Sequence, residues 1–198
     1  MSGWDDSALG PPVVSVEVDL YTAGFRVTGH MRTRFRRVGE ILNLTGSSHL
    51  VVDDGTVTEY AAPGQPRSGP PVMVSVDAVL FGLSSGTDDS PTEELRIQKR
   101  PVRAQLSIGP FWLDGQVHVP QGSRPMDGLL NVADRFLPLT DVTITSAAYP
   151  GFARTAPVLA IQRNLAQVLM VADDEDEAER LAEIFPEDRS AGSWPTGG

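Results

Sequence analysis

The most concentrated group of side chains able to do chemistry is a basic run, Arg32-Thr-Arg-Phe-Arg-Arg37. It places four guanidinium groups, those of Arg32, Arg34, Arg36 and Arg37, around one phenyl ring. Such a group can clamp a phosphate or stack on nucleobases. The same arginines can instead lie in an exposed loop or at a strand end and pair with the chain's many carboxylates, which is the interpretation we favour.

A second group, in the latter half of the chain, combines a glycine, an aspartate, an asparagine and an arginine in a fixed order. Gly115 is followed by Asp127-Gly-Leu-Leu-Asn131 and then by Ile161-Gln-Arg163-Asn164. This order resembles the motif of Sm-like proteins. The resemblance implies a small β-barrel in which Asn131 and Arg163 line a ring pore and hold a flipped RNA base. The first half departs from the motif, since Gly39 and Val76-Asp77 stand where the aspartate and the arginine turn would be.

A simpler interpretation of Asn131, and of Asn43 in the first half, requires no ligand. Each asparagine ends an expected helical turn, where asparagine suits the left-handed cap. Its side chain can also bond the backbone of the loop that follows. We favour this interpretation over RNA binding.

The clearest helix pattern covers residues 173–186. Its acidic start suits the positive N-terminal end of a helix. One face carries apolar residues at i, i+3, i+4 and i+7 spacing, among them Leu181 and Phe185. This face either caps the protein's own core or docks on a partner, and in the second case Leu181 and Phe185 would be binding residues.

The composition leaves little room for catalysis. The 198 residues include no cysteine, which excludes disulfides, thiolate catalysis and cysteine-based metal sites. His30, His49 and His118 fall on separate expected strands without the spacing of a zinc site. No nucleophile elbow and no phosphate-binding glycine loop is visible. We therefore expect no enzyme activity, no cofactor and no metal.

Charge and hydropathy indicate which classes of partner and which cellular location to expect. The formal net charge of −10 argues against bulk binding to nucleic acid or to anionic membranes. No apolar run approaches the roughly 20 residues that span a bilayer, and the acidic, polar N-terminus does not resemble a secretory signal. These features favour a cytoplasmic protein without membrane contact, for which nucleic acid is the less favoured partner.

The chain repeats itself. Four segments match in the same order: Phe25–Gly29 with Phe111–Gly115, Arg36–Asn43 with Arg124–Asn131, Val51–Asp53 with Leu139–Asp141, and Val74–Asp77 with Ile161–Asn164. The offset starts at 86 residues (111 − 25) and is then 87 or 88. Four ordered matches at nearly one offset predict a tandem duplication.

Each copy has the pattern of five short strands, and the fold class we expect is mainly β. Alternating apolar residues predict strands with one buried face, as in Val14–Leu20. Five strands in so short a segment predict two tandem, partly open, SH3- or Sm-like barrels over residues 13–86 and 95–172, packed against each other. The helix at 173–186 and disordered tails at 1–12 and 187–198 complete the expectation. Asp77 and Asn164 are expected at positive-φ hairpin tips, and Lys99–Arg103 is expected to be a solvated linker edge.

These observations predict a non-enzymatic module that binds other proteins, as an adaptor or scaffold, or assembles with copies of itself. The alternative is an Sm-like protein that binds single-stranded RNA or a nucleotide. The paired copies also resemble a bacterial family of duplicated domains in which the stretch from arginine to Leu-Leu-Asn recurs, and that resemblance implies no activity. The candidate binding residues are Arg32, Arg34, Arg36, Arg37, Asn131, Arg163, Leu181 and Phe185.

Overall fold

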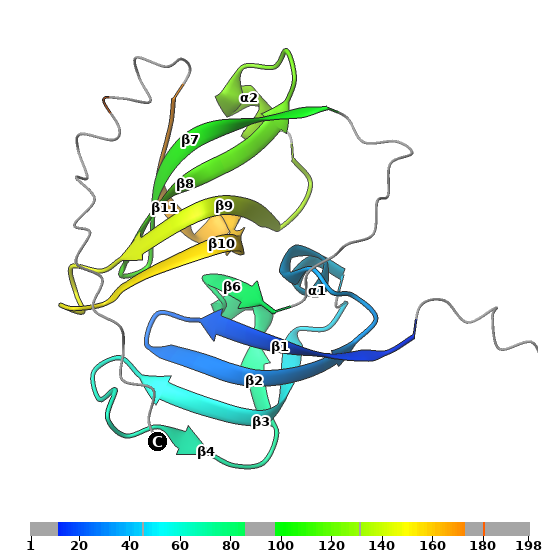
Figure 1. The fold of residues 1–198 in the computed structure, drawn as a ribbon, viewed down its shortest axis with the longest axis vertical. Helices are drawn as coiled ribbons and strands as arrows, with labels where there is room; N and C mark the ends of the chain where they lie inside the picture. Colours follow the sequence, from blue (N-terminus) through cyan, green and yellow to red (C-terminus); the bar gives the residue numbers. More distant parts are fainter. Residues whose placement is uncertain (1–11, 45, 86–97, 131, 173–179, 181–198) are drawn as a thin grey trace, which may run out of the picture.

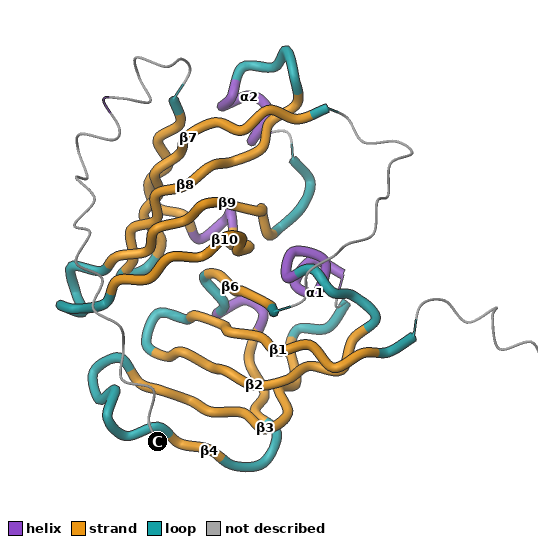
Figure 2. Tube along the Cα trace, viewed as in Figure 1, coloured by secondary structure: helices purple, strands orange, loops and turns teal. Residues whose placement is uncertain are grey.

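The computed structural model of the protein describes residues 12–44, 46–85, 98–130, 132–172 and 180. The expected C-terminal helix except for residue 180, both expected tails except for residue 12, and Asn131 lie outside the described residues. Within the described ranges the chain is mainly β, as expected, with two short α-helices (Figure 2). Neither of these helices is long and apolar enough to cross a membrane.

The described part of the first half contains six strands and one α-helix, arranged as Figure 1 shows. In β1 the expected burial of Val16, Val18 and Leu20 is confirmed, but Asp19 and Tyr21 on the other face of the strand are buried as well. The elements are β1 (Val14–Tyr21), β2 (Phe25–Thr33), α1 (Val38–Leu44), β3 (His49–Glu59), β4 (Arg67–Ser68), β5 (Val72–Ser75), the 3-10 turn η2 (Val76–Ala78) and β6 (Phe81–Ser84).

The described part of the second half has five strands and one α-helix. The segment Lys99–Arg103 is not a linker edge but the first half of β7, where it pairs with the end of β8. The elements are β7 (Lys99–Ile108), β8 (Phe111–Pro120), α2 (Pro125–Leu130), β9 (Phe136–Thr145), β10 (Ala153–Gln162), the 3-10 turn η3 (Arg163–Leu165) and β11 (Ala166–Val171).

All strands pair antiparallel in one continuous sheet. Its order is β11-β7-β8-β9-β10-β6-β1-β2-β3-β4, and β5 also pairs with β3. The halves meet where β6 pairs with β10, seen at the centre of Figure 1. The expectation of two separate barrels is therefore not confirmed, because the described strands form one sheet that does not close on itself.

Strand pairing follows the same scheme in both halves, so the paired residues of the first half have counterparts in the second. Leu50 pairs with Val74, and Leu137 pairs with Ile161, so the offset is 87 on both strands (137 − 50 and 161 − 74). Val57 pairs with Arg67, and Ile144 with Arg154, again at 87 (144 − 57 and 154 − 67). Thus β4 and β5 together are the counterpart of the single strand β10, interrupted by the Gly-Pro-Pro segment at 69–71.

Local backbone geometry also recurs. Among the described residues other than glycine, only Asp54 and Asp141 have positive φ, 51° and 53°. They are 87 residues apart (141 − 54), so Asp54 and not Asp53 is the counterpart of Asp141. Asp77 and Asn164 do not have the expected positive φ, because they lie in the 3-10 turns η2 and η3, which need only ordinary φ values.

Each half contributes side chains to the core of the other. The core of the first half includes Phe136 and Ala160 from the second half. The core of the second half includes Tyr21, Leu80 and Phe81 from the first. This sharing buries the end of β1 on both faces, so the halves pack as one structural unit.

Candidate functional site

The junction between the halves is formed first by main-chain bonds. Gly82 lies opposite Ala160 and Phe81 opposite Ile161 where β6 meets β10. The backbone N–H of Gln162 donates to the carbonyl of Leu80 at 2.8 Å. These bonds add the edge of one half to the edge of the other, which is how a strand recruits a protein partner.

Asn43, at the end of α1, fixes the second half through its backbone. Its side-chain nitrogen donates to the Phe136 carbonyl at 2.9 Å, and its side-chain oxygen accepts from the Phe136 N–H at 2.8 Å. The expectation that this asparagine bonds the loop after its own helix is therefore wrong. An amide supplies one donor and one acceptor, and Phe136 presents both matching groups at the start of β9.

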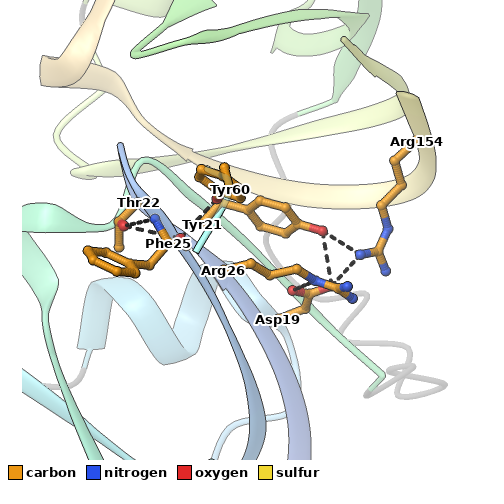
Figure 3. Close-up of polar contacts among 7 residues, drawn as sticks. All are labelled: Asp19, Tyr21, Thr22, Phe25, Arg26, Tyr60 and Arg154. Atoms are coloured by element: carbon orange, nitrogen blue, oxygen red, sulfur yellow. Dashed lines mark hydrogen bonds and ion pairs between the residues drawn. The ribbon is translucent and has the colours of Figure 1, made fainter. Parts of the chain in front are cut away.

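A buried carboxylate connects the halves on the other side of the junction (Figure 3). Asp19 accepts two bonds of 2.9 Å from Arg26 in the neighbouring strand. It also forms an ion pair with Arg154 from β10. The Asp19 side chain is 12% exposed, whereas Arg26 and Arg154 are 39% and 36% exposed. One acidic and two basic side chains thus join three strands from both halves.

One tyrosine hydroxyl belongs to this network, and a second bonds a main-chain carbonyl. The Tyr21 hydroxyl donates to Asp19 and accepts a bond from Arg154. The Tyr60 hydroxyl donates to the carbonyl of Phe25 at 2.9 Å. Burial is the main cause that raises the pKa of both phenols above 10, with the Asp19 charge adding to it. Neither phenol is a base at neutral pH, so the network acts as a structural connection.

All three tyrosines of the chain lie in one aromatic cluster that spans the halves. Tyr21 stacks on Phe81 with ring centroids 4.5 Å apart, and Tyr60 lies 4.8 Å from Tyr149. Phe111 contacts members of both pairs edge-on. Such contacts between residues distant in sequence stabilise one relative position of the two halves.

The basic run is distributed over a surface segment between β2 and α1. Arg32, Arg34 and Arg36 are exposed and Arg37 is half-buried. Phe35 packs against the core of the first half. The phenyl ring is therefore turned to the interior and does not offer its face for stacking on a nucleobase.

Arg163 is not presented to a ligand. Its guanidinium donates to the backbone carbonyl of Val132, and the side chain is half-buried. Asn131, Leu181 and Phe185 lie outside the described residues. Of the two residues implied by the Sm-like resemblance, the structure therefore describes only Arg163, and its guanidinium is bonded to a main-chain carbonyl.

The sequence did not indicate the Asp19 network. Asp19 stands between Val18 and Leu20 in an alternating pattern, which predicts a solvent-facing side chain. Its partner Arg154 is 135 residues away (154 − 19), and no local signal relates them. Within the described ranges, no group of three or more histidine or acidic residues could hold a metal ion.

Three strands keep one side unpaired in the part of the chain that the structure describes. β11 pairs only with β7, and β4 and β5 pair only with β3. Val168 on β11 is 44% exposed and Met73 on β5 is 67% exposed. We call these three strands the open edges. Comparison with family models, with curated proteins and with solved structures gave no match to the chain.

Proposed function

We propose that this protein is a non-enzymatic module that binds other proteins, as an adaptor or assembly unit, through its open edges. The observation that carries the proposal is the junction of β6 with β10, where the chain already joins two folded halves by pairing strand edges. Unpaired strand edges with exposed apolar residues can form the same kind of contact with a strand of another protein.

Duplication of one small barrel-type unit is part of this proposal. The shared strand order, the paired 3-10 turns and the positive φ of Asp54 and Asp141 all support it. Two linked binding units also gain avidity, because the second contact becomes intramolecular. The absence of cysteine suits a reducing compartment, and we place this activity in the cytoplasm.

RNA or nucleotide binding remains the alternative hypothesis, and no geometric observation favours it. The guanidinium of Arg163 is bonded to Val132, and the chain has 26 acidic against 16 basic residues. The absorbance ratio at 260 and 280 nm of the native protein tests it directly. Excess absorbance at 260 nm that Arg32→Glu removes would replace protein binding with RNA binding as the proposal.

The test of protein binding is affinity capture with matched variants. Val168→Lys places a charge on the open edge of β11, whereas Val158→Lys makes the same change at a residue of similar exposure, 47%, on β10. We expect wild type and Val158→Lys to retain the same proteins, and Val168→Lys to lose them, because an edge lysine opposes strand pairing. Identical captures by all three proteins would contradict the proposal.

A further inference from the structure

We infer that the open edges serve each other: β11 of one molecule pairs with β4–β5 of a second copy of this chain, in head-to-tail assembly. The inference rests on the proposed function, because it names the partner of the same edges. It follows from the junction inside the chain, which provides a template for the contact between chains.

The counterpart of β6 is β11. Gly82 pairs with Leu20 on β1, and Leu169 pairs with Leu106 on β7. In the same way, Phe81 is the counterpart of Val168, 87 residues away (168 − 81). The strand that reaches out of the first half to make the junction therefore has an equivalent in the second half, and this equivalent has no described partner beyond β7.

The counterpart of the receiving strand, β10, is β4–β5. Ala160 lies opposite Pro138, and Met73 lies opposite Val51 at the same offset of 87 (160 − 73 and 138 − 51). Repetition of the junction between two molecules places Leu169 of one opposite Met73 of the other. Val168 then lies opposite Val74, as Phe81 lies opposite Ile161 within the chain.

Solvent exposure differs between the strand edges that pair at the junction of β6 with β10 and the open edges. Phe81 and Ala160 at the junction are both 0% exposed, whereas their counterparts Val168 and Met73 are 44% and 67% exposed. The internal contact therefore buries the very positions that remain exposed at the two ends of the molecule.

The helices follow the same scheme. α1 packs against β9 and β10 across the junction. Its counterpart α2 leaves Met126 and Leu130 exposed, by 40% and 70%. In a repeated junction α2 covers β3 and β5 of the next molecule. Four of the eight exposed large apolar residues in the described part of the chain thus lie on the two matching surfaces: Met73, Met126, Leu130 and Val168.

Charge is complementary as well. Inside the chain Arg154 forms an ion pair with Asp19, and Asp19 lies opposite Thr28 on the neighbouring strand. The counterparts of Asp19 and Thr28 are Gln105 and Asp114, which also lie opposite each other, at an offset of 86 (105 − 19 and 114 − 28). The counterpart of Arg154 is Arg67, which is exposed on β4. Arg67 of one molecule therefore faces Asp114 of the next, and Asp114 already pairs with Arg103 of its own chain, as Asp19 pairs with Arg26.

The contact uses two different surfaces, so it is heterologous. Such contacts form a ring when the rotation between units closes and a filament when it does not. Each molecule has one donating end, β11 with α2, and one receiving end, β4–β5. A change at one end consequently leaves the other end able to bind.

The experiment is light scattering in line with size-exclusion chromatography on the full chain at increasing concentration. We expect wild type to have a mass of several multiples of 21.3 kDa. Arg67→Glu at the receiving end and Val168→Lys at the donating end should each give 21.3 kDa monomers. Arg32→Glu and Val158→Lys, which make the same changes at exposed positions away from the contact, should assemble like wild type.

A mixture of the two monomeric variants provides the decisive test. Arg67→Glu keeps an intact β11, and Val168→Lys keeps an intact β4–β5, so an equimolar mixture should form a complex of two chains and grow no further. Its formation also demonstrates that both variants are folded. Monomeric wild type at every concentration, assembly by either variant alone, or a mixture that stays monomeric would each overturn the inference. Affinity capture of a different protein by a monomeric wild type would preserve the proposed function while overturning self-assembly.

Discussion

Asn43 shows how one side chain can join two halves of a protein. Both atoms of its amide group are paired with Phe136, which is 93 residues away. The sequence placed Asn43 at a helix end, where a local role for asparagine is the reasonable expectation. The partner could not be predicted from the sequence, because it depends on how the two halves dock and not on any neighbouring residue.

Asp19 and Asp77 each pair with an arginine of the second half, but in different surroundings. The Asp19 side chain is 12% exposed, whereas that of Asp77, bonded to Arg135, is 77% exposed. Asp19→Asn leaves Arg26 and Arg154 without their counter-charge. We expect it to lower the free energy of unfolding by about 2 kcal/mol, which is less than a fully buried pair would lose because both arginines contact water.

Asp77→Asn is the matched control, and it should cost less than about 1 kcal/mol because exposed ion pairs contribute little. Urea denaturation of the two variants and wild type measures both changes. Equal effects at the two positions would mean that Asp19 is no more important to the junction than a surface pair.

At the scale of elements, the recurring glycine of the second strand has a clear physical cause. The sheet has an irregularity in register after Thr28 in β2 and after Asp114 in β8, next to Gly29 and Gly115. A Cβ on Gly29 would lie 2.6 Å from the Asp53 carbonyl oxygen, and one on Gly115 would lie 2.9 Å from that of Thr140. The glycine that contributes to the Sm-like resemblance is therefore required by a close approach between strands.

Alanine at either glycine should destabilise the protein. We expect a loss of about 3 kcal/mol for Gly29→Ala, where φ is also positive, and about 2 kcal/mol for Gly115→Ala. Gly39→Ala in α1 is the control, because no atom lies within 4 Å of the added Cβ, and a helical alanine gains up to about 1 kcal/mol. Thermal unfolding of the three variants tests the order, and a neutral Gly29→Ala would refute the steric explanation.

The elements were the most predictable feature of this protein. Period-two alternation indicates β1 and β2, and the internal matches indicate that each half has the same series of strands. The register between the two halves was harder to predict from the sequence. A one-residue error, which aligns Asp53 with Asp141, leaves the sequence similarity almost unchanged. β4 was missed because it has two residues in a segment rich in proline and glycine, and only its pairing with Thr56 and Val57 identifies it.

At the scale of the whole molecule, the shared cores explain why two barrels do not stand apart. Alternation predicts which residues are buried but not against what. Tyr21 lies on the face of β1 opposite to Val18 and Leu20, where alternation predicts exposure, yet it packs in the core of the second half. Phe136 begins β9 and packs in the core of the first. Each small unit buries more apolar surface by this exchange than it could alone.

The shared aromatic cluster makes the stability of the whole molecule sensitive to alkaline pH. Tyr21 and Tyr60 have pKa values raised above 10 by burial in the folded protein, whereas the unfolded chain ionises near 10. The folded state therefore binds more protons than the unfolded state above that pH, and the free energy of unfolding falls as pH rises. Each phenol contributes about 1.4 kcal/mol per pH unit, so the pair contributes roughly 3.

Urea denaturation between pH 9 and pH 11 measures this slope, and stability should be nearly constant below pH 10. Tyr21→Phe keeps the ring but removes one phenol, so it should halve the slope. Phenol absorbance that rises near pH 10 in the folded protein, with no loss of stability, would show that the cluster is open to water and does not hold the two halves together.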